Sequence, residues 1–217
     1  MRPSCGKLRS GIAHTLGHRR GATVHRLKRG LTASRTRYIA QAGVIAAVYG
    51  GLTWLTLAFG GALAWGPIQF RVSEAATVLA LFTPAAVPGL AIGSVVANLL
   101  NPQAVWPFSA LDVVLGSLGT LLGAVWTWRL RHRPVVALLG PVVANAFIVA
   151  AYLPILLRGI GVPMTPVLGL SLSSAWPLLY GVLVVTIAVG QAVVVYGLGL
   201  PLSMALRRTG VAELFDR

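Results

Sequence analysis

The chain has 217 residues, of which 56% are hydrophobic and only 10% are charged, and its mean hydropathy is +0.80. So few charged side chains cannot cover the surface of a water-soluble domain of this length, and the composition therefore predicts an integral membrane protein. The net charge of +14 does not indicate a nucleic-acid-binding surface, because the positive charge is concentrated at the chain ends and in one short loop.

Residues 1–37 form a basic leader with ten of the 18 Lys and Arg residues and no acidic residue. Two interpretations stay open. The leader is either a disordered cytoplasmic segment, or an amphipathic helix on anionic lipid, since Leu8, Ile12 and Leu16 follow one another at helical spacing.

Six apolar segments follow, most of them close to the ~20 residues that a helix needs to cross a bilayer. They predict an all-α transmembrane bundle in residues 38–206 and a short cytoplasmic tail at 207–217. A signal peptide cleaved after ALA at 62–64 is a rival interpretation of the first segment, which is long for that role. The predicted spans are residues 38–60, 73–88, 90–106, 111–128, 135–157 and 175–203, with a break at Pro88-Gly89 between the second and the third.

The loops predict the orientation of the bundle. With six spans, the leader, the three arginines of loop 129–133 and the pair Arg207 and Arg208 all fall on one side of the membrane. The positive-inside rule places that side in the cytoplasm, so both termini are expected inside a plasma membrane.

The few polar residues of the spans are expected between the midplane and the outer face. Ser73 is predicted to cap the second helix, with Glu74 in its first turn beside the positive end of the helix dipole. Polar groups from five helices in one leaflet predict a ligand cavity open to the outside. The candidate binding residues are Arg71, Glu74, Asn98, Asp112, Asn145 and Gln191.

Each of these residues also has a structural interpretation. Arg71 and Glu74 can form an interfacial ion pair, Asp112 can be a helix N-terminal acid, and the amides can make hydrogen bonds between helices. Tyr152 and Tyr180 are expected to be packing or interface residues rather than ligand contacts.

The first span carries small residues at every fourth position: Ala42, Ala46 and Gly50, with Gly43, Ala47 and Gly51 beside them. Such a strip allows another helix to approach closely, either within the bundle or from a partner protein. A similar strip of glycines at 116, 119 and 123 is expected to pack internally.

The sequence lacks the residues that several kinds of catalysis and cofactor binding require. Neither lysine, Lys7 nor Lys28, ends a P-loop signature, so ATP binding of that type is excluded. No histidine lies in a predicted span, and the one cysteine is Cys5, so neither a buried metal site nor a serine–histidine hydrolase is expected. The sequence therefore predicts that the chain is not an enzyme and holds no cofactor of its own.

Five stretches in order resemble the QueT family: IQFRVSEAATVLALF at 68–82, VPGLAIGSVVANLL at 87–100, LDVVLGSLGTLLGA at 111–124, PVVANAFIVAAYL at 141–153 and GLGLPL at 197–202. The resemblance implies a substrate-binding S component of an energy-coupling-factor (ECF) transporter, which takes up queuosine precursors. It also implies the partners, a transmembrane T component and two cytosolic ATPases. Ala42 and Ala46 match the family's A-x-x-x-A docking strip, which Gly50 extends, whereas Gly190-Gln191 replaces a glycine–acid pair.

The implied 7-deazaguanine cargo suggests roles for the candidate residues. Glu74 would accept the adjacent N–H groups of the pairing edge, and Asp112 would pair with an aminomethyl cation. Arg71 would touch the cargo or orient Glu74. Asn98 and Asn145 would contact the ring, and Gln191 a remaining edge.

Two alternatives stay open. The cargo can be another vitamin-like molecule, or the chain can be a self-sufficient proton-coupled carrier with Glu74 or Asp112 as the relay. A membrane enzyme or a purely structural subunit fits the residues least well.

Overall fold

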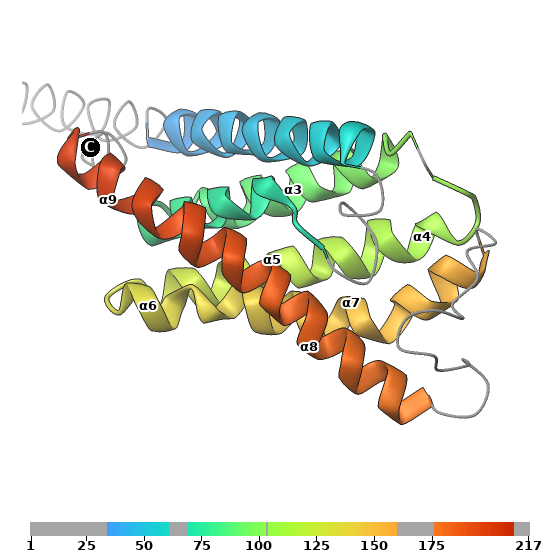
Figure 1. Ribbon diagram of the computed structural model, residues 1–217. Coiled ribbons are helices and arrows are strands. Elements are labelled where there is room, and N and C mark those ends of the chain that lie inside the picture. Colours follow the sequence, from blue (N-terminus) through green and yellow to red (C-terminus); the bar gives the residue numbers. More distant parts are fainter. Residues whose placement is uncertain (1–33, 61–68, 103, 160–175, 211–217) are drawn as a thin grey trace, which may run out of the picture. The chain divides into compact units, whose positions relative to one another are not determined.

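The computed structural model describes residues 34–60, 69–102, 104–159 and 176–210, and the leader and most of the tail lie outside these ranges. By its contacts the chain divides into two units, Met1–Ala40 and Gln41–Arg217, and the second unit carries all of the candidate binding residues. Within the described ranges the chain is all-helical and has no strand. The prediction of six apolar helices is therefore confirmed (Figure 1).

The six helices differ in length. Four are long and apolar enough to cross a membrane, and two are shorter apolar helices, so the chain is a multi-pass membrane protein. The long ones are Ser34–Phe59, Ser109–Arg129, Pro134–Gly159 and Trp176–Arg208; the short ones are the 3₁₀ helix η1 (Val72–Leu81) and α3 (Ala86–Leu99).

Three of the long helices contain several elements in series. Two of them include a turn of π-helix, a local widening that is frequent at functional sites. The elements are α4 (Ser109–Leu111), η2 (Asp112–Gly116) and α5 (Ser117–Arg129); α6 (Pro134–Ala137) and α7 (Leu139–Gly159); and α8 (Trp176–Val194), η3 (Val195–Gly199) and α9 (Leu200–Arg208).

The predicted break between the second and third helices at Pro88-Gly89 is wrong. The break lies at Thr83-Pro84, where the Thr83 hydroxyl accepts a hydrogen bond from the Ala85 N–H at 3.3 Å. Pro88 is tolerated inside α3 because it lies in the first turn, where its missing N–H has no helical partner. A Cβ on Gly89 would lie 2.7 Å from the Ala42 carbonyl oxygen, so this glycine serves helix packing instead of chain reversal.

Helix ends differ from the predicted ones for identifiable reasons. The third helix stops at Leu99 and not at 106, because the residue before Pro102 is disfavoured in a helix. The last helix continues to Arg208. The positive charges of Arg207 and Arg208 in its final turn interact favourably with the negative end of the helix dipole. The sixth helix therefore extends beyond the predicted span, which stopped at 203.

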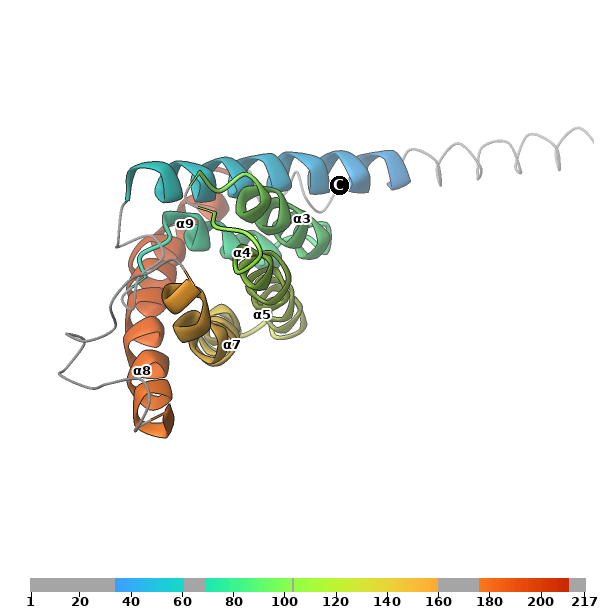
Figure 2. The same cartoon turned by 90° about the vertical axis from the view of Figure 1, so that its right-hand side faces the viewer.

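The core of the second unit is built around α5, which lies between α3 and α7 (Figures 1 and 2). Glycines on α5 allow these contacts, as predicted: a Cβ on Gly123 would lie 2.7 Å from Pro141 Cα. A second layer of apolar packing joins α7 to α8 through buried Leu153, Leu183 and Ile187. A third joins η1 to η3 and the start of α7 through Val78, Val142 and Val195.

The small-residue strip of the first helix contacts α3. A Cβ on Gly93 would lie 2.6 Å from the Ala46 carbonyl oxygen and 3.1 Å from the Gly50 nitrogen. Gly89 makes a similar contact with Ala42. The strip of Ala42, Ala46 and Gly50 therefore packs against α3 within the chain, rather than facing outward for a partner protein. The neighbouring small residues Gly43, Ala47 and Gly51 are exposed.

Candidate functional site

Element η1 carries a set of buried polar side chains into the bundle. Its N-cap is Arg71 and its first turn contains Glu74, and both are almost completely buried. No side chain caps the helix, and the Ser73 hydroxyl is buried without a hydrogen-bond partner, so the prediction of Ser73 as the N-cap is wrong. η1 therefore places its polar residues among other helices and not at the lipid interface.

Glu74 belongs to a hydrogen-bonded chain that crosses four helices. The Tyr49 hydroxyl donates to Glu74 Oε1 at 2.6 Å and lies 3.3 Å from Thr120 Oγ1. The Thr120 hydroxyl in turn lies 3.3 Å from Ser94 Oγ on α3. One carboxylate oxygen of Glu74 is thus fixed by the first helix, α3 and α5 together.

Arg71 and Asp112 form the second half of the polar cluster. Arg71 Nη2 lies 3.5 Å from Asp112 Oδ1, and the two side chains are only 5% and 8% exposed. The Tyr152 hydroxyl donates to the same Asp112 oxygen at 2.5 Å. Asp112 is therefore more than a helix N-terminal acid. Tyr152 packs in the apolar core between α7 and α8, as predicted, and its hydroxyl also holds the Asp112 carboxylate.

Gly116 makes the meeting of these groups sterically feasible. A Cβ on this residue would lie 2.9 Å from Asp112 Oδ1, 3.0 Å from the Tyr152 hydroxyl and 3.4 Å from Asn98 Nδ2. Asn98 Nδ2 also donates to the Asp112 carbonyl oxygen at 2.9 Å. The π-helical turn η2, which begins at Asp112 and ends at Gly116, thus brings α3 and α7 to one carboxylate.

The last two candidates border this cluster. Asn145 is buried on α7, and its Oδ1 lies 2.7 Å from the position of a Cβ on Gly119 of α5. Gln191 on α8 is buried next to Gly190, which packs against the backbone of Gln69, two residues before Arg71. The structure therefore brings Arg71, Asn98 and Asp112 into direct contact. Glu74 is linked to Arg71 through the backbone of η1, where the Glu74 N–H donates to the Arg71 carbonyl oxygen. Asn145 and Gln191 lie on neighbouring elements.

Four buried side-chain atoms in the described ranges have no hydrogen-bond partner within the protein: Ser73 Oγ, Glu74 Oε2, Asn98 Oδ1 and Gln191 Oε1. Three of them are acceptors only, and they come from three helices. An unpaired buried acceptor is unfavourable by about 1–3 kcal/mol, and such atoms mark places where a ligand or water completes the bonding. The chemistry that fits them is a ligand rich in N–H donors.

The residues that sequence reasoning missed are hydroxyl side chains: Tyr49, Ser94 and Thr120. All three are buried and take part in the Glu74 chain. One signal was available for Tyr49, which follows buried Ile45 by four residues and so shares its inward face. Within the described ranges, no three His, Cys, Asp or Glu side chains converge as a metal site would require.

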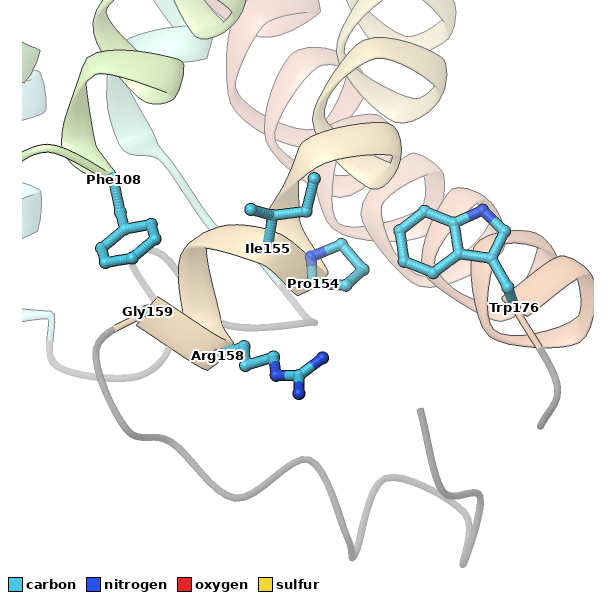
Figure 3. A pocket seen from close by; sticks show the side chains of 6 residues that line it. All are labelled: Phe108, Pro154, Ile155, Arg158, Gly159 and Trp176. Carbon is cyan, nitrogen blue, oxygen red and sulfur yellow. The ribbon is translucent and has the colours of Figure 1, made fainter. Parts of the chain in front are cut away.

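A separate pocket of about 450 Å³ lies where α7 ends and α8 begins (Figure 3). Phe108 and Trp176 lie on either side of it, with Pro154 and Ile155 of α7 between them. Arg158 contributes the charged group of this lining. Phe108 immediately precedes α4, and Asp112 follows α4 directly. The pocket therefore lies at the same end of the helix Ser109–Arg129 as Asp112.

Apolar helices that enclose a cluster of charged, amide and hydroxyl groups define a multi-pass membrane protein with a polar interior site. Residues 39–208 match the QueT transporter family, and the chain belongs to this family. The family resemblance of the sequence motifs is thereby confirmed, and the family consists of transporters.

One relative is the queuosine precursor transporter QueT of Lactococcus lactis subsp. cremoris (strain MG1363). It is 36% identical over 90 residues, which are 41% of this chain and 48% of the relative. The chain thus matches about half the length of this curated relative. No solved structure matches the chain.

Proposed function

We propose that the chain is the substrate-binding S component of an ECF-type importer, and that it captures a 7-deazaguanine queuosine precursor from outside the cell. Membership of the QueT transporter family and the name of the Lactococcus relative support the cargo class. The polar interior site supports a membrane protein that binds a small molecule between its helices.

The observation that carries this proposal is the set of unpaired buried acceptors. A 7-deazaguanine presents adjacent N–H donors on its pairing edge, and a carboxylate can accept two of them side by side. Glu74 has one oxygen held by Tyr49 and the other unpaired, so it is oriented and still able to accept. Asn98 Oδ1 and Gln191 Oε1 supply further acceptors.

The remaining candidates take supporting roles in the proposal. Asp112 Oδ1 is already engaged by Arg71 and Tyr152, so we assign Asp112 to positioning Arg71 rather than to an aminomethyl cation of the cargo. Asn145 lies against Gly119 and would contact the cargo ring only at the edge of the cluster.

Energy for uptake is proposed to come from partners, a T component and two cytosolic ATPases, since the chain has no P-loop signature. The described first helix packs Ala42, Ala46 and Gly50 against α3. We therefore propose that the T component docks on the exposed side of the same helix, where Gly43, Ala47 and Gly51 lie.

Cargo binding is tested with purified protein in detergent. A deazaguanine should raise the Tm of the native chain by mass action, and Glu74→Gln should weaken its affinity at least tenfold, because an amide replaces one acceptor oxygen by a donor. The matched control is Gln41→Glu, at a half-buried position outside the cluster. Undiminished binding by the Glu74→Gln variant would contradict the assigned role, and a shift produced only by a vitamin would reassign the cargo.

Partner dependence is tested by uptake into proteoliposomes. The chain alone should give none above the rate of empty vesicles, whereas the chain with its T component and ATPases should accumulate cargo when ATP is enclosed. Accumulation by the chain alone under a proton gradient would overturn the S-component proposal and establish the carrier alternative.

A further inference from the structure

A second pocket, of about 540 Å³, lies at the opposite end of the helices Pro134–Gly159 and Trp176–Arg208 from the one in Figure 3. Its wall is formed where three helices end: Phe82 follows η1, Trp128 and Arg131 come from the end of α5 and the loop after it, and Arg207 comes from α9. We call it the basic pocket. Its volume falls within the roughly 300–1,000 Å³ that is usual for small-molecule sites.

The two arginines of the basic pocket are held by aromatic rings. The Arg131 guanidinium carbon lies 4.0 Å from the centroid of the Trp128 ring, and that of Arg207 lies 5.2 Å from the centroid of the Phe82 ring. Cation–π contact at these distances orients a guanidinium face while its N–H edge stays available. Arg131 uses one donor on the Trp128 carbonyl oxygen, at 3.3 Å, out of the five that a guanidinium has.

No carboxylate of the described ranges neutralises this pocket. The acids in those ranges are Glu74 and Asp112, and both are buried in the polar cluster. The whole chain has 18 Lys and Arg residues and four Asp and Glu residues, so its own acids cannot balance its cations. A pocket with two oriented guanidinium groups and the exposed His132 is therefore set up for an external anion.

We propose that the basic pocket binds the phosphate of an anionic phospholipid headgroup. Oriented guanidinium groups match phosphate oxygens in geometry and charge. The rest of the lining is apolar and aromatic, with Leu81, Phe82, Trp128 and Pro134, which suits the glycerol region of a lipid at the end of a transmembrane bundle. Basic pockets between helices at this level of a membrane are a general way to bind anionic headgroups.

The test compares two double variants that remove the same charge from the same end of the helices. Arg131→Gln/Arg207→Gln empties the pocket of its guanidinium groups, and Arg129→Gln/Arg208→Gln removes exposed arginines that do not line it. Each protein is titrated with short-chain phosphatidylglycerol in a neutral detergent, with phosphatidylcholine as the reference lipid. The readout is Tm, and cargo binding is measured on each variant to confirm that it is folded.

Native protein and the control double variant should show a saturable rise of about 5 °C with phosphatidylglycerol. The pocket double variant should show less than a quarter of it. Equal shifts in all three proteins, or equal loss in both double variants, would overturn the proposal, because binding would then depend on total charge alone.

Two further arms separate the sources of the anion. Inorganic phosphate at equal concentration should give little of the shift, since it lacks the glycerol and acyl parts that the apolar lining contacts. If phosphate alone gives the full shift and lipid adds nothing, the lipid assignment is overturned. A shift with poly-glutamate but not with phosphatidylglycerol would likewise overturn it in favour of an acidic protein segment.

Discussion

Gly116 has no side chain, yet the arrangement of the polar cluster depends on it. The carboxylate of Asp112, the hydroxyl of Tyr152 and the amide of Asn98 all lie within 3.4 Å of the position where a Cβ would be. Because these atoms are the ends of side chains from three elements, a methyl group added here would displace them and disturb the bond between Tyr152 and Asp112.

We expect Gly116→Ala to lower cargo affinity at least tenfold and to destabilise the protein by about 1–3 kcal/mol through overpacking. Gly197→Ala is the matched control, since Gly197 also lies in a π-helical turn but has no heavy atom within 4 Å of its Cβ position. Isothermal titration with cargo and thermal unfolding in detergent measure the two effects. Similar behaviour of both variants would show that the site tolerates displacement.

Tyr49→Phe tests the bond that orients Glu74. The substitution removes the 2.6 Å donor and leaves Glu74 Oε1 without this partner, so we expect a loss of about 1–3 kcal/mol in stability and weaker cargo binding. Tyr180→Phe is the control, because its hydroxyl bonds to the Phe147 carbonyl at an exposed position. Equal unfolding midpoints for the two variants would mean that Tyr49 does not hold the carboxylate.

Among single residues, charged and amide side chains of the cluster were predictable from the sequence and hydroxyl side chains were not. Asn98 or Asp112 in an apolar span is conspicuous, because burying such a group without partners is unfavourable. Thr120 is not conspicuous, because a helical hydroxyl can bond to its own backbone, as Thr120 does to the Gly116 carbonyl at 3.2 Å. Its second role, beside Tyr49 and Ser94, appears only when three helices are in place.

The contact of the first helix with α3 is made by backbone rather than by large side chains. Gly93 is the tightest position on α3, since a Cβ there would lie 2.6 Å from the Ala46 carbonyl oxygen. The oxygen belongs to helical backbone and cannot rotate away, so the helices themselves would have to separate.

Gly93→Ala should therefore destabilise the protein by about 1–3 kcal/mol, although alanine has the higher helix propensity. Gly51→Ala, on the exposed side of the first helix, has open space around its Cβ position and should be neutral or slightly stabilising. Unfolding of both variants in the same detergent decides between these expectations. A neutral Gly93→Ala variant would show that the two helices can move apart freely.

For the helices, their number was predictable from the sequence and their boundaries were not. Pro88-Gly89 resembles a loop in the sequence, but Pro88 lies in the first turn of α3 and Gly89 faces Ala42. The signal that marks the actual break is Thr83-Pro84, a hydroxyl residue followed by proline, which favours a turn. Proline and glycine occur both in loops and inside helices, and only the packing of a neighbouring helix shows which of the two applies.

For the whole molecule, the structure bears on one part of the predicted topology, the position of the basic regions at a common end. Arg131 of the loop after α5 and Arg207 of α9 line one pocket, so two of the three basic regions lie at the same end of the second unit. The side of the membrane on which this end lies stays a prediction from the positive-inside rule.

Cysteine labelling tests this orientation in a Cys5→Ser background, which removes the one native thiol. A cysteine at exposed position His132 should react with a membrane-impermeant maleimide only after the cells are opened, and one at exposed Val105 should react in intact cells. The reverse pattern would place the basic end outside and would contradict import through a site that opens at the α4 end.

The backbone contact between the first helix and α3 also limits how these sequences can diverge. At this contact a Cβ on Gly50, Gly89 or Gly93 would meet the backbone of the facing helix, so only the smallest residue fits there, whereas the adjacent exposed positions can vary in size with little effect. Comparison of distant homologues should then show a period-four stripe of invariance that resembles a recognition motif. Its cause is architectural, and evolutionary constancy at these positions is poor evidence of a binding surface.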